Sequence, residues 1–469
     1  MTSFLHDDTI CALATAAGGA MAVIRVSGPD AIAITDKIFT SPRGKRLAEM
    51  SSHTAHYGTI HDDDGQVVDD VVVTLFRSPH SYTGEDTVEI CCHGSRYIIT
   101  LLLQQLIGHG CRQAGPGEFT QRAFLNGKLD LSQAEAVADL IASTNANTHK
   151  MALSQLRGNF SHRLGELREH LLRLTSLLEL ELDFSDHEDL EFADRNELLT
   201  ITQTAEQEIS ALSHSFSTGK ALRQGIAVAI IGKTNVGKST LLNRLLHDDK
   251  AIVSDIHGTT RDVIEDTTQI GGVTFRFIDT AGIRATADEI EQLGIERTYQ
   301  KLDEAAIVLW MTDAAPEAQE AEDIIARTEG KKLIAIVNKI DKTDSAAYNP
   351  FVHLSDADRE KFSDIPVIPI SAKKGINIEQ LEEAIYTAAD IPSITQNDVI
   401  VTHLRHYEAL ERAHDDILRV EEGLKAGLSG DLLSEDLRAA IDHLSEIVGG
   451  AITPDETLGN IFSHFCVGK

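Results

Sequence analysis

The sequence predicts a multidomain protein with three kinds of architecture along one chain. Residues 1–126 alternate short apolar runs such as MAVIRVSG with Gly, Pro and Asp, which predicts a mixed α+β domain. Residues 127–219 and 389–469 carry apolar residues three and four positions apart, which is typical of long amphipathic helices. Residues 220–388 alternate β-rich runs with helical stretches, which predicts a mostly parallel, doubly wound α/β sheet.

The helical pattern occurs on both sides of the α/β block, in HRLGELREHLLRL before it and in THLRHYEALERAHDDILRVEEGL after it. The economical interpretation is one all-α domain in two segments, with the α/β domain inserted between them. Two separate helical bundles are the alternative, which the sequence alone leaves open. Inside the block, IGGVTF contains a Gly-Gly turn that predicts a hairpin and one antiparallel strand.

The composition narrows the class of protein. A net charge of −31 argues against sequence-blind binding of nucleic acid or anionic lipid, because both need a positive field. The five cysteines are odd in number and scattered, which indicates a reducing compartment. Cys91 and Cys92 lie in the run TVEICC, which predicts a buried strand rather than a metal site, since neighbouring strand residues face opposite sides. The start MTSFLHDDTI has no basic segment, and no apolar run reaches the roughly 18 residues of a membrane span. We expect a soluble, cytoplasmic protein without a membrane partner.

The stretch Gly232–Ser239, GKTNVGKS, fits the pattern G-x-x-x-x-G-K-[ST] of a phosphate-binding loop. It follows the β-rich run IAVAII and opens the helical stretch STLLNRLL, which is the context that this loop requires. Backbone N–H groups of such a loop wrap the phosphates, and the helix N-terminus adds positive potential. We predict that Lys238 reaches the β- and γ-phosphates and that Ser239 binds Mg²⁺.

Further segments complete a guanine-nucleotide site in the expected order. Thr260 in TTRD is placed to close over the γ-phosphate, and Asp279 in DTAG can hold Mg²⁺ through water. Asp341 in NKID is an acceptor-only carboxylate that matches the paired donors of guanine, which adenine lacks. The segment SAK supports the base. These segments predict a Ras-like GTP-binding domain. The predicted GTP contacts are Asn235, Val236, Gly237, Lys238, Ser239, Thr240, Ser254, Asp255, Ile256, His257, Gly258, Thr259, Thr260, Asp279, Thr280, Ala281, Gly282, Asn338, Lys339, Ile340, Asp341, Ser371, Ala372 and Lys373.

One residue departs from the Ras pattern. A glutamine beside the D-x-x-G segment orients the attacking water in Ras-type enzymes, but the position is Ile283 here. Isoleucine cannot orient water, so either hydrolysis is feeble or other groups assist it. Asn235 is suited to hold a monovalent cation against the phosphates, with carbonyls from the loop Ser254–Thr259. The alternative is that Asn235 only braces the loop, and spacing alone does not separate the two.

The motifs resemble those of the MnmE (TrmE) family of tRNA-modification GTPases over nearly the whole length. The resemblance rests on VIRVSG, SYTGEDTVEI, PGEFTQRAFLNGKLDLSQAEAVADLI, the GTP-binding motifs and the final IFSHFCVGK. It implies a homodimer that works with an FAD-containing MnmG subunit, in a heterotetramer, with FAD only in that partner. Together they modify carbon 5 of the wobble uridine of certain tRNAs to an aminomethyl-type group. The tRNA is bound through the complex.

The resemblance also implies the roles of individual residues. GTP hydrolysis depends on Mg²⁺ and K⁺, with Glu291, Lys238 and Thr260 as catalytic residues. Mg²⁺ is held by Ser239 and Thr260, and K⁺ by Asn235, Ser254, Ile256 and Thr259. Without the resemblance, Glu291 in ADEIEQLGIER is more simply a residue of a solvated helix face.

The N-terminal domain is, by the same resemblance, a dimerisation domain and a site for 5-formyl-tetrahydrofolate or a related folate that carries the one-carbon unit. The folate-binding positions map to Arg25, Glu89, Lys128 and Lys469. Arg25 and Lys128 are natural partners for the carboxylates of folate, and Glu89 can accept from donors of its pterin ring. We expect the C-terminal tail, Cys466–Lys469 (CVGK), to reach this site across the dimer. Cys466 is a candidate redox or catalytic thiol.

Two other classes of protein remain open from the sequence. One is a GTPase that acts only as a binding switch, in ribosome assembly or signalling. Such a protein has no need for Arg25, Glu89 and Lys128 around a folate. The other is a one-carbon enzyme with a regulatory GTP-binding domain, which would turn over folate without a flavin partner.

Overall fold

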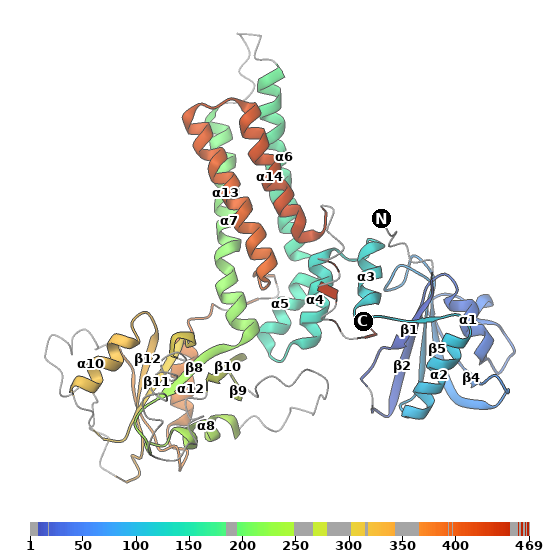
Figure 1. The fold of residues 1–469 in the computed structure, drawn as a ribbon, viewed down its shortest axis with the longest axis horizontal. Coiled ribbons are helices and arrows are strands. Elements are labelled where there is room, and N and C mark those ends of the chain that lie inside the picture. The colour runs from blue at the N-terminus through green and yellow to red at the C-terminus, as the bar shows by residue number, and fades with distance from the viewer. Residues whose placement is uncertain are drawn as a thin grey trace, which may run out of the picture. The chain divides into compact units, whose positions relative to one another are not determined.

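The fold is that of a computed structural model, and by its contacts the chain divides into two compact units. One unit comprises 1–141, 155–209 and 409–469, and the other comprises 142–154 and 210–408. The first holds the N-terminal sheet and a helical bundle, and the second holds the α/β sheet (Figure 1). The structure describes residues 8–16, 18–183, 195–247, 266–278, 302–314, 318–342, 365–392, 394–395, 397–450, 458, 461–462, 465 and 467–468.

The N-terminal part of the first unit is a seven-stranded sheet in the order β3-β4-β5-β6-β2-β1-β7. Neighbouring strands are antiparallel except β1 and β7, which are parallel. Helices α1 (Ala31–Ile38) and α2 (Arg96–Gly108) supply apolar residues to its core. The predicted mixed α+β domain is confirmed. The strands are β1 (Ile10–Leu13), β2 (Met21–Ser27), β3 (Phe39–Thr40), β4 (Thr54–His61), β5 (Val67–Phe76), β6 (Thr87–His93) and β7 (Arg112–Gln113), and a short 3₁₀ helix, η1, spans Leu47–Glu49.

The two faces of this sheet differ, because successive strand residues point to opposite sides. One face packs against α1 and α2, with Ile24, Ile90 and Leu102 among its fully buried residues. On β6, Cys92 is 2% exposed whereas Cys91 is only half-buried, which confirms the predicted strand. The opposite face is therefore the one that carries half-buried polar residues.

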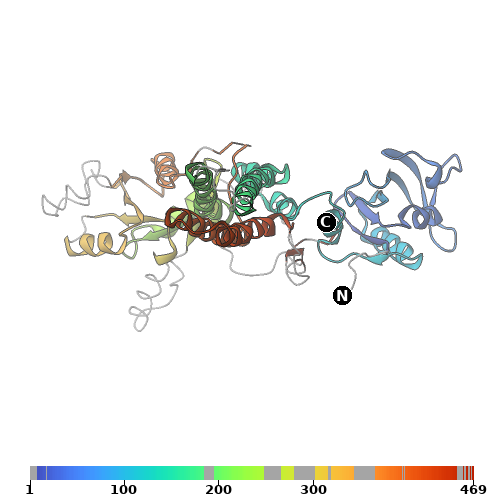
Figure 2. The same ribbon diagram turned by 90° about the horizontal axis from the view of Figure 1, so that it is seen from above.

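The rest of the first unit is helical. Its bundle is formed by α6 (Asn159–Asp183), α14 (Gly430–Val448) and the parts of α7 (Arg195–Gln224) and α13 (Leu404–Ala426) that belong to this unit, which lie side by side (Figures 1 and 2). Arg438 donates to Glu179 at 2.7 Å between α14 and α6, and His414 and Glu206 join α13 to α7 at 2.9 Å. Because α6 precedes the α/β block in sequence and α14 follows it, the insertion is confirmed. Shorter helices of this unit are α3 (Glu118–Leu125) and α4 (Leu131–Ala142), whereas most of α5 (Ala146–Leu156) belongs to the second unit.

The second unit is built on a six-stranded sheet in the order β13-β12-β11-β8-β10-β9. All pairs are parallel except β9 and β10, which form the hairpin predicted from IGGVTF. The mostly parallel, doubly wound sheet is thus confirmed. Its strands are β8 (Ile226–Ile231), β9 (Asp266–Ile270), β10 (Val273–Ile278), β11 (Ile307–Thr312), β12 (Lys332–Val337) and β13 (Val367–Pro369), and its helices are α8 (Lys238–His247), α10 (Ala318–Arg327) and α12 (Ile378–Ala388).

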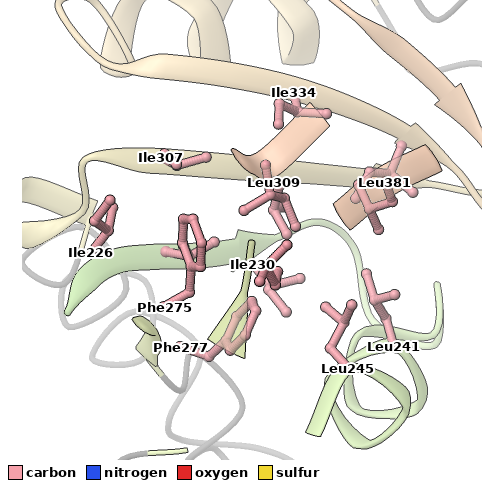
Figure 3. Packing of buried hydrophobic residues seen from close by; sticks show 14 of the residues in the cluster. Ile226, Ile230, Leu241, Leu245, Phe275, Phe277, Ile307, Leu309, Ile334 and Leu381 are labelled. Carbon is pink, nitrogen blue, oxygen red and sulfur yellow. The ribbon is translucent and has the colours of Figure 1, made fainter. Parts of the chain in front are cut away.

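Each face of this sheet has its own apolar cluster. Figure 3 shows the first, in which Leu241 and Leu245 of α8 and Leu381 of α12 meet β-strand residues such as Phe275 and Leu309. The second cluster lies on the other face and joins Ala321 of α10 to strand residues. Strands β8 and β11 are buried along their whole length, as expected for central strands covered on both faces.

No helix among the described residues combines the length and apolarity that crossing a membrane requires.

Replacement by alanine should have opposite effects on thermal stability at two helical glycines. A Cβ on Gly219 of α7 would lie 2.0 Å from the carbonyl oxygen of Val401, whereas a Cβ on Gly165 of α6 would meet nothing within 4 Å. Alanine normally stabilises an exposed helix interior by about 1 kcal/mol relative to glycine. We expect Gly165→Ala to raise the thermal unfolding midpoint. We expect Gly219→Ala to lower it through a clash that costs about 1–3 kcal/mol. Two shifts in the same direction would contradict the close approach at Gly219.

Candidate functional site

The phosphate-binding loop lies between β8 and α8, as its sequence context predicted. Gly232 and Gly237 both have left-handed backbone, with φ of +147° and +107°. A Cβ on Gly232 would lie 2.1 Å from the carbonyl oxygen of Met311, and one on Gly237 would lie 2.4 Å from the Asn338 amide nitrogen. Side chains are therefore excluded at both positions, and the backbone itself forms the cradle that suits a phosphate chain.

The charged side chain of this loop is Lys238. Its ammonium donates to the carbonyl oxygens of Gly232 and Lys233, each at 2.7 Å, so it lies across the loop. Burial lowers the pKa of Lys238, because desolvation disfavours the charged form. Ser239 and Thr240 follow on the first turn of α8 and are exposed, while Val236 is buried beneath the loop. The cradle and the helix N-terminus fit a nucleotide with its Mg²⁺.

Asn338 joins three loops that are far apart in sequence. Its amide nitrogen donates to the carbonyl oxygen of Val236 at 2.7 Å, and its amide oxygen accepts from the N–H of Ala372 at 3.0 Å. The side chain is 4% exposed, so both bonds are shielded from water. The sequence predicted Asn338 as a nucleotide contact. In the structure its carboxamide instead hydrogen-bonds the phosphate-binding loop and the SAK segment, and so holds both against the NKID segment.

The base-recognition residues lie beside this tie. The hydroxyl of Ser371 donates to a carboxylate oxygen of Asp341 at 2.7 Å. That bond, with the nearby Lys374 and Lys342 ammoniums, lowers the pKa of Asp341 below its usual range. The carboxylate therefore stays ionised, and acceptor-only, until the pH falls below that range. Ile340 pairs through its N–H with the carbonyl oxygen of Ile370, and the Lys373 carbonyl accepts from Arg244 at 3.3 Å.

Asn235 stands apart from the buried members of the site. It is exposed and has left-handed backbone, with φ of +63°. The ammonium of Lys339 donates to the Asn235 carbonyl oxygen at 2.8 Å and also pairs with Asp313. The backbone of Asn235 is thus held, while its carboxamide has no hydrogen bond to any of the described residues. This geometry fits a residue whose side chain is available to a ligand.

A large part of the predicted nucleotide site lies outside the described residues. These positions are Ser254, Asp255, Ile256, His257, Gly258, Thr259, Thr260, Asp279, Thr280, Ala281, Gly282 and Glu291. Cys466 and Lys469 of the tail lie outside them as well.

A second site is built on the open face of the N-terminal sheet. Arg25 of β2 and Glu89 of β6 are cross-strand partners, and two guanidinium nitrogens of Arg25 donate to Glu89 Oε1 at 3.0 and 2.8 Å. The Arg25 guanidinium carbon lies 5.1 Å from the ring centre of Tyr82 and 5.6 Å from that of Phe119. Both distances are within cation–π range, so the two rings and the carboxylate hold Arg25 in one orientation.

Lys128 contacts the segment 79–84, which carries Tyr82. Its ammonium donates to the carbonyl oxygen of Pro79 at 2.9 Å, and Gly84 packs against its aliphatic stem. Asn126 adds a bond to the carbonyl oxygen of Thr83 at 2.7 Å. The structure therefore joins Arg25 directly to Glu89, whereas it relates Lys128 to them through the intervening 79–84 segment.

The C-terminal tail lies against the N-terminal domain of its own chain. Val467 forms an antiparallel bridge with Pro116, and a Cβ on Gly468 would lie 2.1 Å from the carbonyl oxygen of Leu13. Phe462 and Phe465 are buried in a cluster with α4 residues. Val467 is thus paired within one chain, and the expected reach of the tail across a dimer stays a prediction, because Cys466 and Lys469 lie outside the described residues.

Sequence reasoning missed three features of these sites. Tyr82 and Phe119 flank Arg25, although SYTGEDTVEI and PGEFTQRAFL had been singled out only as family motifs. The buried Arg122 of the second motif was not assigned a role. The available signal was the spacing of Glu118 and Arg122 in EFTQRAFL, because residues four positions apart lie on one face of a helix and can form an ion pair.

The guanine-recognition geometry gives a prediction for Asp341→Asn. An amide presents an N–H toward the guanine amino group and loses one charge-assisted acceptor, whereas the 2-oxo group of xanthine matches that N–H. We expect GTP affinity to fall roughly a hundredfold or more, with a gain in affinity for xanthosine triphosphate. Competition binding with the two nucleotides measures both. Unchanged GTP affinity would show that Asp341 does not bind the base.

Comparisons with known proteins agree with this architecture. A family model described as MnmE helical domain matches residues 131–466, and one described as GTP-binding protein TrmE N-terminus matches 9–128. A protein named tRNA modification GTPase MnmE from Bacteroides fragilis (strain YCH46) is 57% identical over 470 residues, which covers 99% of this chain and 100% of that protein. Its namesake from Porphyromonas gingivalis is 50% identical over 480 residues and 100% of both chains.

A solved FeoB G-domain from Methanococcus jannaschii is 27% identical and covers 35% of this chain and 98% of that chain, with a TM-score of 0.24. At that score the sheet topology above, rather than the likeness, carries the fold assignment. The family match, in contrast, spans the N-terminal domain, both helical segments and the inserted domain. The chain belongs to the MnmE (TrmE) family of tRNA modification GTPases.

Proposed function

We propose that this chain is a K⁺-stimulated GTP hydrolase that acts with an FAD-containing partner on carbon 5 of the wobble uridine of certain tRNAs, using a tetrahydrofolate-linked one-carbon unit. The observation that carries the proposal is that one chain holds two built sites. One is the nucleotide cradle fixed by Asn338, and the other is the Arg25–Glu89 pair between two aromatic rings, with the tail against the same domain.

The nucleotide site would bring together the charges that phosphoryl transfer needs. Lys238, already directed across the loop, would neutralise the β- and γ-phosphates, and Ser239 with Thr260 would hold Mg²⁺. Asn235, with Ser254, Ile256 and Thr259, would hold K⁺, which supplies the positive charge of an absent arginine finger. Glu291 would orient the attacking water, since Ile283 stands where Ras-type enzymes have a glutamine.

The cation proposal is tested with Asn235→Gly rather than alanine. Glycine removes the carboxamide but keeps the left-handed backbone at φ of +63°, whereas alanine would add strain of about 1–2 kcal/mol. We expect hydrolysis in K⁺ to exceed that in Na⁺, by as much as the order of 10³-fold if the cation replaces an arginine finger, and the variant to lose that difference. Thr234→Ala, which trims the preceding exposed side chain, is the control and should keep it. Equal rates in both salts for the unaltered protein would exclude a K⁺ site.

The N-terminal site offers matched chemistry for a folate. Glu89 would present an acceptor to its pterin donors, with the Arg25 cation beside it, and Lys128 would present a cation to the carboxylates of its glutamate tail. The rings of Tyr82 and Phe119 give this site apolar walls, and burial raises the pKa of Tyr82 so that the phenol stays protonated. Lys469 would add a further cation from the tail.

Calorimetric titration with 5-formyl-tetrahydrofolate tests this site. Arg25→Ala should weaken binding roughly tenfold to a hundredfold through loss of charge-assisted bonds. Arg438→Ala, which removes an exposed ion-paired arginine of the bundle, should leave affinity unchanged. A chain that binds no folate would favour the class of GTPases that act only as binding switches.

We further propose that the chain is a homodimer that meets tRNA through a complex with MnmG. The support is electrostatic. With a net charge of −31 the chain has no overall positive field to attract RNA, so tRNA would meet either a local basic patch of this chain or a partner subunit, and we favour the partner.

A further inference from the structure

A buried guanidinium holds together the segments around the N-terminal site. The Arg122 side chain is 4% exposed. One of its terminal nitrogens donates to the carbonyl oxygen of Asp8 at 2.8 Å and to Glu85 Oε1 at 3.1 Å. The other donates to Asp8 Oδ1 at 2.7 Å and to Glu118 Oε1 at 3.1 Å. Arg122 thus binds three carboxylates from three separate parts of the chain.

Glu118 is the member of this network that binds the turn before α3. Its second oxygen accepts from the N–H of Gly115 at 2.8 Å, and its first also pairs with Arg112. Burial alone would raise the pKa of Glu118, but the bonds from Arg112, Gly115 and Arg122 outweigh it and lower the pKa. The carboxylate is therefore ionised at neutral pH and fixes the Gly115–Gly117 turn.

The C-terminal tail packs against that turn. Pro116 forms the bridge to Val467, and a Cβ on Gly117 would lie 2.9 Å from both the Phe462 carbonyl oxygen and the Phe465 Cβ. Such close packing leaves the tail no room to stay docked if the turn moves. Holding Gly115 through Glu118 therefore holds the docking surface of the tail.

The other side of the network reaches Arg25. Glu85 Oε2 accepts from the hydroxyl of Ser27 at 2.7 Å, and the Ser27 and Thr83 hydroxyls are hydrogen-bonded at 2.7 Å. Thr83 is the neighbour of Tyr82, which covers Arg25. Helix α3 makes a second connection, because Phe119 and Thr120 directly follow Glu118.

Both connections end at the walls of one site. Phe119 contributes the second ring beside Arg25, and Thr120 is hydrogen-bonded to the Tyr82 hydroxyl at 2.9 Å. The first turn of α3 therefore carries the tail support and a wall of the Arg25 site on consecutive residues. A displacement of this turn would disturb both together.

We propose that Glu118, Arg122 and Glu85 are positioning residues that couple docking of the C-terminal tail to ligand binding at the Arg25–Glu89 site. The proposal rests on the folate site of the proposed function. The tail docks on the N-terminal domain through Val467 and Gly468, and this docking is the event that the proposal couples to the ligand. A ligand that fixes Tyr82 and Phe119 also fixes the turn under the tail, so each event lowers the ordering cost of the other.

The test is a double-mutant cycle in the full chain, read by calorimetric binding of 5-formyl-tetrahydrofolate. One change removes residues 466–469, and the other is Glu118→Gln, which keeps the side-chain shape but removes the charge that Arg122 and Arg112 bind. We expect tail removal alone to weaken binding roughly tenfold. In the Glu118→Gln background, which already binds weakly, tail removal should change the affinity less than about twofold, because the tail is no longer held.

Glu85→Gln acts on the other side of Arg122 and should give the same loss of coupling, so the test does not depend on one variant folding. Glu179→Gln is the matched control, since it also neutralises a glutamate bound to an arginine but lies in the exposed Arg438 pair of the bundle. It should retain the tenfold effect of the tail. Thermal unfolding of each variant checks that the domain is intact.

A second readout follows from reciprocity. Ligand should slow release of Lys469 by a carboxypeptidase in the unaltered chain and in Glu179→Gln, but not in Glu118→Gln. Tail removal without effect in the unaltered chain, or losses that simply add in the cycle, would overturn the coupling while leaving the folate site intact. Absence of folate binding in the unaltered chain would instead overturn the proposed function, and the coupling with it.

Discussion

Arg122 buries a guanidinium among Asp8, Glu85 and Glu118, and the order of the N-terminal site depends on it. An unpaired charge at this depth would cost several kcal/mol, so the segments that supply the carboxylates are tied to one geometry. One side of the network connects to Tyr82 and Phe119, which flank Arg25. The other side connects to the Gly115–Gly117 turn, against which the tail packs. A network of this kind contributes specificity of position more than net stability, because the cost of taking the Arg122 and Glu118 charges out of water offsets much of the gain from pairing them.

In the α/β unit a neutral side chain, the carboxamide of Asn338, holds separate segments together in the way that the Arg122 charge does in the N-terminal domain. The carboxamide of Asn338 satisfies one buried carbonyl and one buried N–H, and in doing so joins the phosphate-binding loop to the NKID and SAK segments, which we predict to recognise the base. Glycine at 237 lets the backbone come close enough to Asn338 for this tie, and glycine at 232 lets the loop pass close to Met311. The parallel strands bring these loops to one edge of the sheet, where the helix N-terminus also points. Nucleotide affinity and local stability are therefore linked through the same two hydrogen bonds.

On the face of the N-terminal sheet opposite α1 and α2, the register of strand pairing decides which residues meet. Arg25 and Glu89 are 64 positions apart in sequence, and antiparallel pairing of β2 with β6 sets them side by side. The opposite face is packed by α1 and α2, so a shift of one residue in either strand would bury these charges in the apolar core. The hydrophobic pattern of MAVIRVSG thus keeps the Arg25–Glu89 pair on the face opposite the apolar core.

The sequence alone determined the features that depend on local spacing. These include the phosphate-binding loop between a strand and a helix, the β9–β10 hairpin, the alternation that marks the doubly wound sheet, and the helical segments. Only the tertiary structure decided which distant residues meet: the rings beside Arg25, the partners of Arg122, the double role of Asn338, and the tail on its own N-terminal domain. Local periodicity and turn chemistry are encoded within a few residues, whereas these contacts arise from strand register and packing between segments that the chain brings together only when it folds.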